Sequence, residues 1–131
     1  MDIFIISRDG SKQSIIANLA TAIALRQRGL SVTMMYDQEG MLALAERKFA
    51  YSGLVENYGS ATDKVINEMG FATDPMALLK IAKDSGVDII TCPIWAGVAR
   101  TKNKIPSEVR VVEFEELFRT IAESKKIMGS F

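Results

Sequence analysis

The chain has 131 residues, enough for one domain with a single hydrophobic core and no need for disulfides or metals. Its 16 basic and 16 acidic residues give a formal net charge of zero, so composition provides no general attraction for nucleic acid or for an anionic membrane. Histidine is absent, which excludes Ser-His-Asp and Cys-His catalysis, histidine general bases and histidine metal sites.

The start of the chain, MDIFIIS, has neither the basic segment nor the long apolar segment of a secretory signal. No apolar run approaches the roughly 18 residues that a membrane span needs. The single cysteine cannot form an internal disulfide, as is usual in a reducing compartment. We therefore expect a cytoplasmic protein with no membrane span, no nucleic-acid partner and no cofactor. The balanced charge also removes one barrier to self-association.

The first part of the chain predicts a parallel β-α-β unit. Residues 2–7 (DIFIIS) are an apolar run typical of a strand, and the turn residues RDGS follow. From residue 11, apolar side chains recur at helical spacing until Arg26, Arg28 and Gly29 close the segment. Residues 31–36 (SVTMMY) indicate the second strand. A strand, a helix and a second strand joined by short loops is typical of parallel pairing.

The middle of the chain is less regular. A turn over residues 37–40 precedes a short helix over residues 41–48. In residues 49–72, glycines interrupt the pattern, and only residues 61–69 have helical periodicity. We expect loops around one helix there. This segment should be the most mobile part of the chain and should act as a lid or an interface.

Two helices begin with the same local signal, an N-cap residue followed by proline at the first helical position. Asp74 and Pro75 start one of them. The other follows a β-branched run at residues 87–90, where Cys92 is the N-cap and Pro93 the first helical residue. Free backbone amides and the helix dipole at such a position would lower the thiol pKa of Cys92. The alternative is a core residue, because free cysteines are among the most buried residues.

The last part of the chain completes an α/β pattern. A polar break at residues 102–106 precedes a short strand at residues 109–112 and a closing helix over residues 113–125, with Lys125 and Lys126 at its end. Alternating strands and helices predict a three-layer αβα sandwich around a mainly parallel sheet of four or five strands. We expect one domain over residues 1–131.

Functional residues in parallel α/β sheets gather at the carboxyl ends of the strands. Residues 7–12, 36–40 and 92–97 should therefore share one rim. The candidate site residues on this rim are Cys92 as the nucleophile and, for binding, Ser7, Arg8, Lys12, Tyr36, Pro93, Trp95 and Gly97.

Other interpretations of the rim residues remain open. The segment SRDGSKQS lacks the glycine spacing of a Walker A loop, although Arg8 and Lys12 at a helix N-terminus could hold an anion. The alternative is a capped turn with two solvated basic residues. Asp37 and Glu39 could act as acid and base or as metal ligands, but carboxylates in a turn are usually solvated. Trp95 fits the core or a subunit contact as well as a binding site.

Three segments resemble the DsrE/DsrF-like family of small sulfur-relay proteins: NLATAIAL at residues 18–25, SVTMMYDQEG at residues 31–40 and GVDIITC at residues 86–92. The resemblance covers most of the chain except residues 49–72. It implies parallel-sheet α/β subunits that assemble into homotrimers or hexamers. It also implies that a cysteine at the place of Cys92 accepts sulfane sulfur as a persulfide from a donor protein and passes it to an acceptor protein.

The sequence supports three hypotheses about function. In the first, Cys92 carries sulfur, and Arg8, Lys12 or Arg100 adds positive potential near the thiol. In the second, the chain is a non-catalytic homo-oligomeric binding or regulatory module in which Cys92 belongs to the core. In the third, residues 7–14 bind a small anion or a nucleotide. The accessibility of the thiol separates the first hypothesis from the other two.

Overall fold

A parallel sheet organises the chain in the computed structural model, which describes residues 1–129. Five strands form this sheet within the described residues: β1 (Ile3–Ser7), β2 (Val32–Tyr36), β3 (Asp88–Thr91), β4 (Arg110–Val111) and β5 (Lys126–Met128). Around the sheet lie α1 (Lys12–Gln27), α2 (Gln38–Glu46), the 3-10 helix η1 (Gly53–Tyr58), α3 (Gly59–Glu68), α4 (Pro75–Asp84), α5 (Pro93–Arg100) and α6 (Phe114–Glu123).

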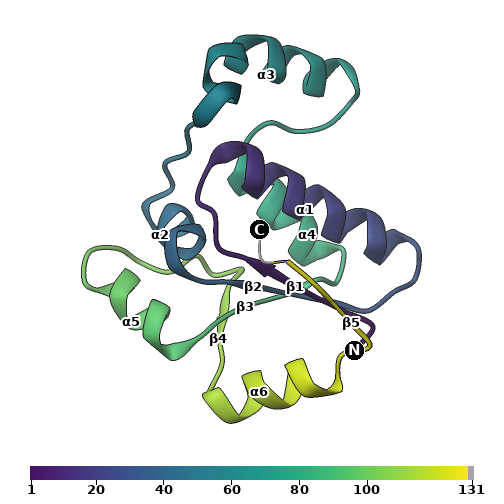
Figure 1. The fold of residues 1–131 in the computed structure, drawn as a ribbon, viewed down its shortest axis with the longest axis vertical. Helices are drawn as coiled ribbons and strands as arrows, with labels where there is room; N and C mark the ends of the chain where they lie inside the picture. Colours follow the sequence, from purple (N-terminus) through teal and green to yellow (C-terminus); the bar gives the residue numbers. More distant parts are fainter. Residues whose placement is uncertain (130–131) are drawn as a thin grey trace.

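The strand order is β4-β3-β2-β1-β5, and every pair is parallel. The chain passes from β4 at one edge to β5 at the opposite edge, so the connecting helix α6 must cross a whole face of the sheet. Figure 1 shows α1 and α4 on one side of the sheet and α6 on the other. The expected three-layer αβα sandwich around a parallel sheet is therefore confirmed.

The two faces of the sheet bury different amounts of side chain. On the helix-rich face, α1, α2 and α4 pack against alternate residues of the central strands, and Leu19, Met34, Leu44 and Leu79 are fully buried there. On the opposite face, which we call the α6 face, the buried cluster is smaller: Phe4, Met35, Ile90, Cys92, Val112 and Leu117. Of these residues only Leu117 comes from α6, and it is the one buried side chain of that helix, while Ile121 of α6 and Trp95 of α5 pack partly buried against the cluster.

Residues 49–72 form an arm that packs least against the rest of the molecule. The arm contains α3, close to the one helix expected, and also η1, which the sequence did not indicate. Neither η1 nor α3 has a buried residue, and Figure 1 shows α3 beyond α1, on the side away from the sheet. The arm is joined to the start of α1 by a hydrogen bond from the Lys12 amide to the Ala50 carbonyl. Its high mobility stays a prediction, which hydrogen exchange would test.

Two expected boundaries were wrong. The turn expected at residues 37–40 is the first turn of α2. Gly40 permits it because a Cβ there would lie 2.8 Å from the Ser7 carbonyl oxygen. The closing helix ends at Glu123 rather than at the lysines, and residues 126–128 form β5. Pairing with β1, which starts with a hydrogen bond from the Lys126 amide to the Asp2 carbonyl, determines this edge strand.

Candidate functional site

Three polar residues follow the three adjacent strands β1, β2 and β3: Arg8, Asp37 and Cys92. Ser7 pairs with Tyr36 and Met35 with Ile90, so Arg8, Asp37 and Cys92 follow on one row at the carboxyl edge of the sheet. We call these three residues the edge row. Side chains alternate between faces along a strand, which places the edge row on the same face as Phe4, Met35 and Ile90, the α6 face.

Asp37 is buried next to Arg8. Its residue is 7% exposed, and the Arg8 Nε lies 3.4 Å from each carboxylate oxygen and donates a hydrogen bond to Oδ2. The other oxygen, Oδ1, is buried without a hydrogen-bond partner among residues 1–129. Burial raises the pKa of Asp37, and the charge and hydrogen bond of Arg8 oppose that rise. The expectation of a solvated carboxylate holds for the exposed Glu39 but was wrong for Asp37.

Cys92 occupies the backbone position that the sequence predicted. It is the N-cap of α5, with Pro93 at the first helical position. The residue is 7% exposed and lies in the apolar cluster of the α6 face, against which Trp95 and Ile121 also pack. Within the described chain the sulfur accepts no capping hydrogen bond. The thiol therefore faces apolar side chains in this conformation, and a reactant would reach it only after its cover moves.

A second polar row lies one residue earlier on the same strands, on the helix-rich face. Ser7, Tyr36 and Thr91 are all fully buried. Asn18 of α1 donates a hydrogen bond of 2.8 Å to the Ser7 Oγ, whereas the Tyr36 hydroxyl and the Thr91 Oγ1 have no partner among residues 1–129. Burial raises the pKa of Tyr36 above its usual range, although Ser7 lowers it in part. Ser7 and Tyr36, both expected to bind a ligand, lie inside the core in this structure.

The start of α1 already uses its hydrogen-bond donors. The Ser11 Oγ caps the helix by accepting from the Ser14 amide, the Ser11 amide donates to Asp9 Oδ1 at 2.7 Å, and the Lys12 amide donates to Ala50. The adjacent Gly10 packs against α2, where a Cβ would lie 2.6 Å from the Glu39 carbonyl oxygen. These three amides are therefore not available to an anion, and an anion site at residues 7–14 would need other donors.

Lys12 faces the arm rather than the edge row. Its Nζ lies 3.3 Å from Asp63 Oδ1 and 4.8 Å from the centre of the Tyr51 ring. Tyr51 also donates a hydrogen bond of 2.5 Å to Asp63. The pKa of Tyr51 is raised to about 12, mainly by burial and then by Asp63. Lys12 therefore fixes the arm to α1 and does not add potential at the thiol.

The remaining expected site residues lie along α5. Pro93 and Trp95 are half-buried, and Gly97 is exposed. Arg100, the last residue of the helix, is also exposed. A helix rises about 1.5 Å per residue, so its guanidinium group belongs to the end of α5 remote from the edge row. The register thus places Arg8 on the same row as Cys92 with Asp37 between them, whereas Lys12 pairs with the arm and Arg100 ends α5.

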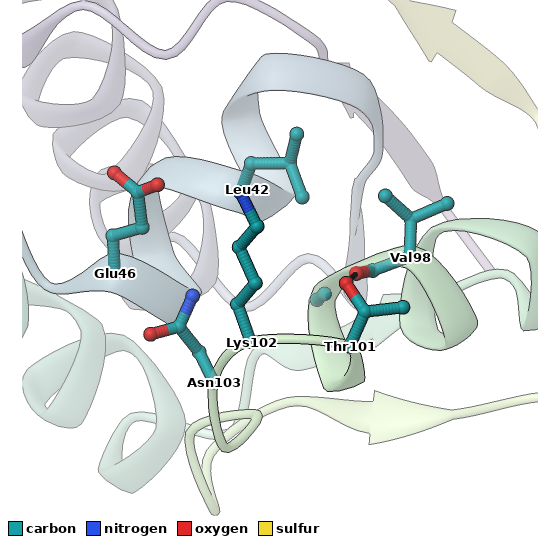
Figure 2. A pocket seen from close by; sticks show the side chains of 7 residues that line it. Leu42, Glu46, Val98, Thr101, Lys102 and Asn103 are labelled. Atoms are coloured by element: carbon teal, nitrogen blue, oxygen red, sulfur yellow. Dashed lines mark hydrogen bonds between the residues drawn. The ribbon is translucent and has the colours of Figure 1, made fainter.

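A cavity of about 150 Å³ lies between α2 and α5, away from the edge row. Figure 2 shows Lys102 extending from the loop after α5 toward α2, with Glu46 and Asn103 on one side of it. Leu42 and Val98 provide apolar walls. Glu46, Val98 and Lys102 are exposed, so this cavity is a shallow surface feature.

No protein-family model matches the chain, and no curated protein matches it significantly. Within the part of the chain that the structure describes, no cluster of three or more His, Cys, Asp or Glu side chains could hold a metal ion. Among the same residues, no helix combines the length and the apolarity needed to cross a membrane. The edge row is therefore the candidate site on its geometry alone.

Sequence reasoning named Asp37 as a possible acid, base or metal ligand but expected it to be solvated, so it missed the burial of Asp37 against Arg8 and the buried, unpartnered Thr91. The sequence did contain an indication of this burial. Asp37 directly follows β2, whose residues are all buried, and so lies at the carboxyl end of a strand. Its partner Arg8 holds the same position after β1, 29 residues earlier. Two opposite charges at equivalent positions after adjacent parallel strands predict an ion pair at the rim.

Proposed function

We propose that the chain is a sulfur carrier of the DsrE/DsrF-like type, in which Cys92 accepts sulfane sulfur as a persulfide and passes it on. The observation that carries the proposal is the place of the chain's single thiol. It is the N-cap of α5 at the carboxyl edge of the sheet, and it follows the Arg8–Asp37 pair in register. The resemblance of the segments around residues 18–25, 31–40 and 86–92 supports the same function.

The transfer needs no cofactor and no oxidant. The Cys92 thiolate attacks the outer sulfur of a donor persulfide, R–S–SH. A new S–S bond forms at Cys92, the donor S–S bond breaks, and the departing thiolate takes up the proton that Cys92 lost. The first amides of a helix have no partner within that helix, so a rotation of the Cys92 side chain toward the Ile94 and Trp95 amides would stabilise the thiolate.

Because Cys92 is buried, the proposed carrier must open before sulfur can be loaded or unloaded. Cys92 is 7% exposed, so loading and unloading need movement of α6 or of the Trp95 side chain. The same cover would protect a bound persulfide from water and from small thiols. Donor and acceptor proteins would then act by opening the α6 face.

Assembly into a homotrimer or hexamer in the cytoplasm is part of this proposal. Large apolar side chains remain exposed on α6 and on the arm, most clearly Phe118 at 60% and Leu54 at 75%. Apolar surface of this kind often marks contacts between subunits. Light scattering tests the assembly, and a 14.4 kDa monomer at micromolar concentration would contradict it.

Intact-protein mass spectrometry after incubation with a small persulfide donor tests the sulfur transfer. The expected product is one sulfur atom heavier, and a reductant should remove that sulfur. Cys92→Ser, which keeps a good N-cap residue, is the matched control and should gain nothing. A wild-type thiol that neither gains sulfur nor reacts with iodoacetamide until the protein unfolds would refute the proposal.

One observation favours a second candidate, a binding or regulatory module in which Cys92 only fills the core. That observation is the packing of Cys92 with Phe4, Met35 and Ile90. Comparing Cys92→Ser with Cys92→Ala separates the two roles. If the side chain acts as a cap, serine is the more stable variant by about 0.5–2 kcal/mol. If the side chain is only a core residue, alanine is the more stable variant, because serine would bury an unpaired hydroxyl at a cost of about 1–3 kcal/mol.

A further inference from the structure

Asp37 lies between Arg8 and Cys92 in the edge row, on the strand that neighbours both of theirs. Neighbouring strands are roughly 4.7–4.9 Å apart, so side chains on one row and one face are within each other's reach. Arg8 approaches the carboxylate from the β1 side. On the other side of Asp37, toward β3, the next residue of this row is Cys92.

The carboxylate of Asp37 has unused capacity to accept a hydrogen bond. Its Oδ1 is buried and has no hydrogen-bond partner among the described residues, and the residue is 7% exposed. An unsatisfied buried oxygen of this kind is costly, and such groups call for a functional reason. A thiol is a weak donor and an ionisable acid, which makes Cys92 a suitable partner in the row.

We propose that Asp37 takes the proton of the Cys92 thiol during sulfur transfer and returns it to the departing thiol, while Arg8 holds the carboxylate in place. This inference rests on the proposed sulfur transfer at Cys92. In the forward step the S–H bond of Cys92 breaks as the carboxyl O–H bond forms. When the donor S–S bond breaks, the proton passes to the donor sulfur, and Asp37 is again a carboxylate.

The charges in the row favour this exchange. Before the step, Arg8 pairs with the Asp37 carboxylate, and the thiol is neutral. After it, the carboxyl is neutral and the negative charge lies on the thiolate of the same row, so the row keeps one positive and one negative charge throughout. Burial raises the pKa of Asp37 toward that of a thiol, and each unit by which the two values approach makes proton transfer ten times more favourable. The remaining carboxylates close in sequence differ: Asp9 binds the Ser11 amide, and Glu39 is exposed on α2.

The test compares three full-length proteins: wild type, Asp37→Asn and Glu39→Gln. Asparagine keeps the shape of Asp37 but cannot take the proton, and Glu39→Gln is the matched control for loss of a carboxylate in the same segment. The rate at which Cys92 gains sulfur from glutathione persulfide is followed by intact mass from pH 6 to pH 10. Circular dichroism verifies that each variant is folded.

Loss of a general base typically slows a reaction by about 10²- to 10⁴-fold, so Asp37→Asn should load at least about 100-fold more slowly at pH 7. The deficit should shrink about tenfold for each pH unit up to the thiol pKa, because hydroxide ionises the thiol without help. Asp37→Glu should recover part of the rate, and Glu39→Gln should load like wild type.

Other results would overturn the inference. If wild type loads and Asp37→Asn loads at the same rate with the same pH profile, Asp37 moves no proton, although the proposed function survives. A constant deficit at every pH would assign Asp37 a structural role only. If wild type does not load at any pH, the proposed function and this inference fall together. If Asp37→Asn does not fold, Asp37→Ser replaces it, since Asp37 is the N-cap residue of α2 and serine is favoured at that position but lacks a base.

Discussion

The two faces of the sheet differ in how they are covered. On the helix-rich face, three helices interlock with the strands, and the buried cluster extends through all of them. On the α6 face, α6 contributes Leu117 as its one buried residue, while Phe114 and Phe118 stack on each other at 5.8 Å on its outer side and remain exposed. A segment with few buried contacts opens at a lower free energy than the core does.

Cys92 belongs to the more thinly covered face. Its low exposure in the closed structure therefore does not make it as inaccessible as a residue under α1 and α4. We therefore expect the face that holds the thiol to open without unfolding of the whole molecule. This difference connects the packing of α6 with the chemistry proposed for Cys92, and variants on each face can test it.

The largest effect is expected from Leu79→Ala on the helix-rich face. Leu79 is fully buried in α4, and such a substitution typically costs about 2–5 kcal/mol in the free energy of unfolding. Urea denaturation measures the loss. Alkylation of Cys92 should accelerate only as far as the globally unfolded population increases, because this variant leaves α6 in place. Faster alkylation than global unfolding allows would contradict the comparison.

Leu117→Ala on the α6 face should cost less, about 2–3 kcal/mol, because the site is next to solvent and can partly collapse. Leu117→Ala should nevertheless increase the alkylation rate of Cys92 more than Leu79→Ala does. Cys92 should react with iodoacetamide at urea concentrations well below the midpoint of unfolding, since loss of Leu117 releases the helix that covers it. Leu79→Ala, compared at equal global stability, is the control. Equal thiol protection in the two variants would show that both faces open together.

Local signals in the sequence predicted much of the fold. The apolar runs of β1, β2 and β3 are short and bounded by turn residues, and the pairs Asp74–Pro75 and Cys92–Pro93 mark helix starts by backbone chemistry alone. In α4 the Asp74 side chain also accepts a hydrogen bond from the Met76 amide, as an N-cap should. Strand runs and helix N-caps depend on residues that are close together in the sequence, so they can be predicted from it.

The errors concern residues whose state depends on distant partners. Strand β5 has three residues and exists because β1 offers an edge to pair with. The burial of Asp37 depends on Arg8, 29 residues away, and the position of Lys12 depends on Asp63, 51 residues away. Cys92 packs with Met35 and Ile90 of the adjacent strands, and its side chain makes no capping hydrogen bond within the described residues. No local pattern contains this information.

Arg110→Met should have a smaller effect, confined to the α6 face. The Arg110 guanidinium joins β3 to α6 through hydrogen bonds to Asp88 at 2.9 Å and to Glu116 at 3.0 Å. These carboxylates raise the pKa of Arg110 above its usual range. The side chains are more than a third exposed, so screening limits the loss to about 0.5–1 kcal/mol. Alkylation of Cys92 should accelerate modestly, and high salt should have the same effect on wild type but none on the variant.

The smallest effect is expected at Asp2, which directly precedes β1 and bonds to Ser31 before β2 and to Lys125 before β5. Asp2 accepts hydrogen bonds from the Ser31 amide and hydroxyl, and it lies 3.3 Å from the Lys125 ammonium group. The hydrogen bonds from Ser31, and then that from Lys125, lower the pKa of Asp2 to about 2. An unfolded chain has a value of about 3.9.

Because the folded value is the lower one, the ionised carboxylate stabilises the native state above about pH 4, and this contribution disappears as the pH falls toward about 2. Asp2→Asn, which keeps an acceptor but removes the charge, should therefore lower the melting temperature slightly at pH 7, and the difference should shrink as the pH falls toward about 2. Thermal melts of both proteins across this range measure the difference. The alkylation rate of Cys92 should be the same in both, since Asp2 lies at the amino end of β1 and the thiol at the carboxyl edge. If Asp2→Asn accelerated alkylation, the protection of the thiol would depend on the contacts of Asp2 as well as on the packing of α6.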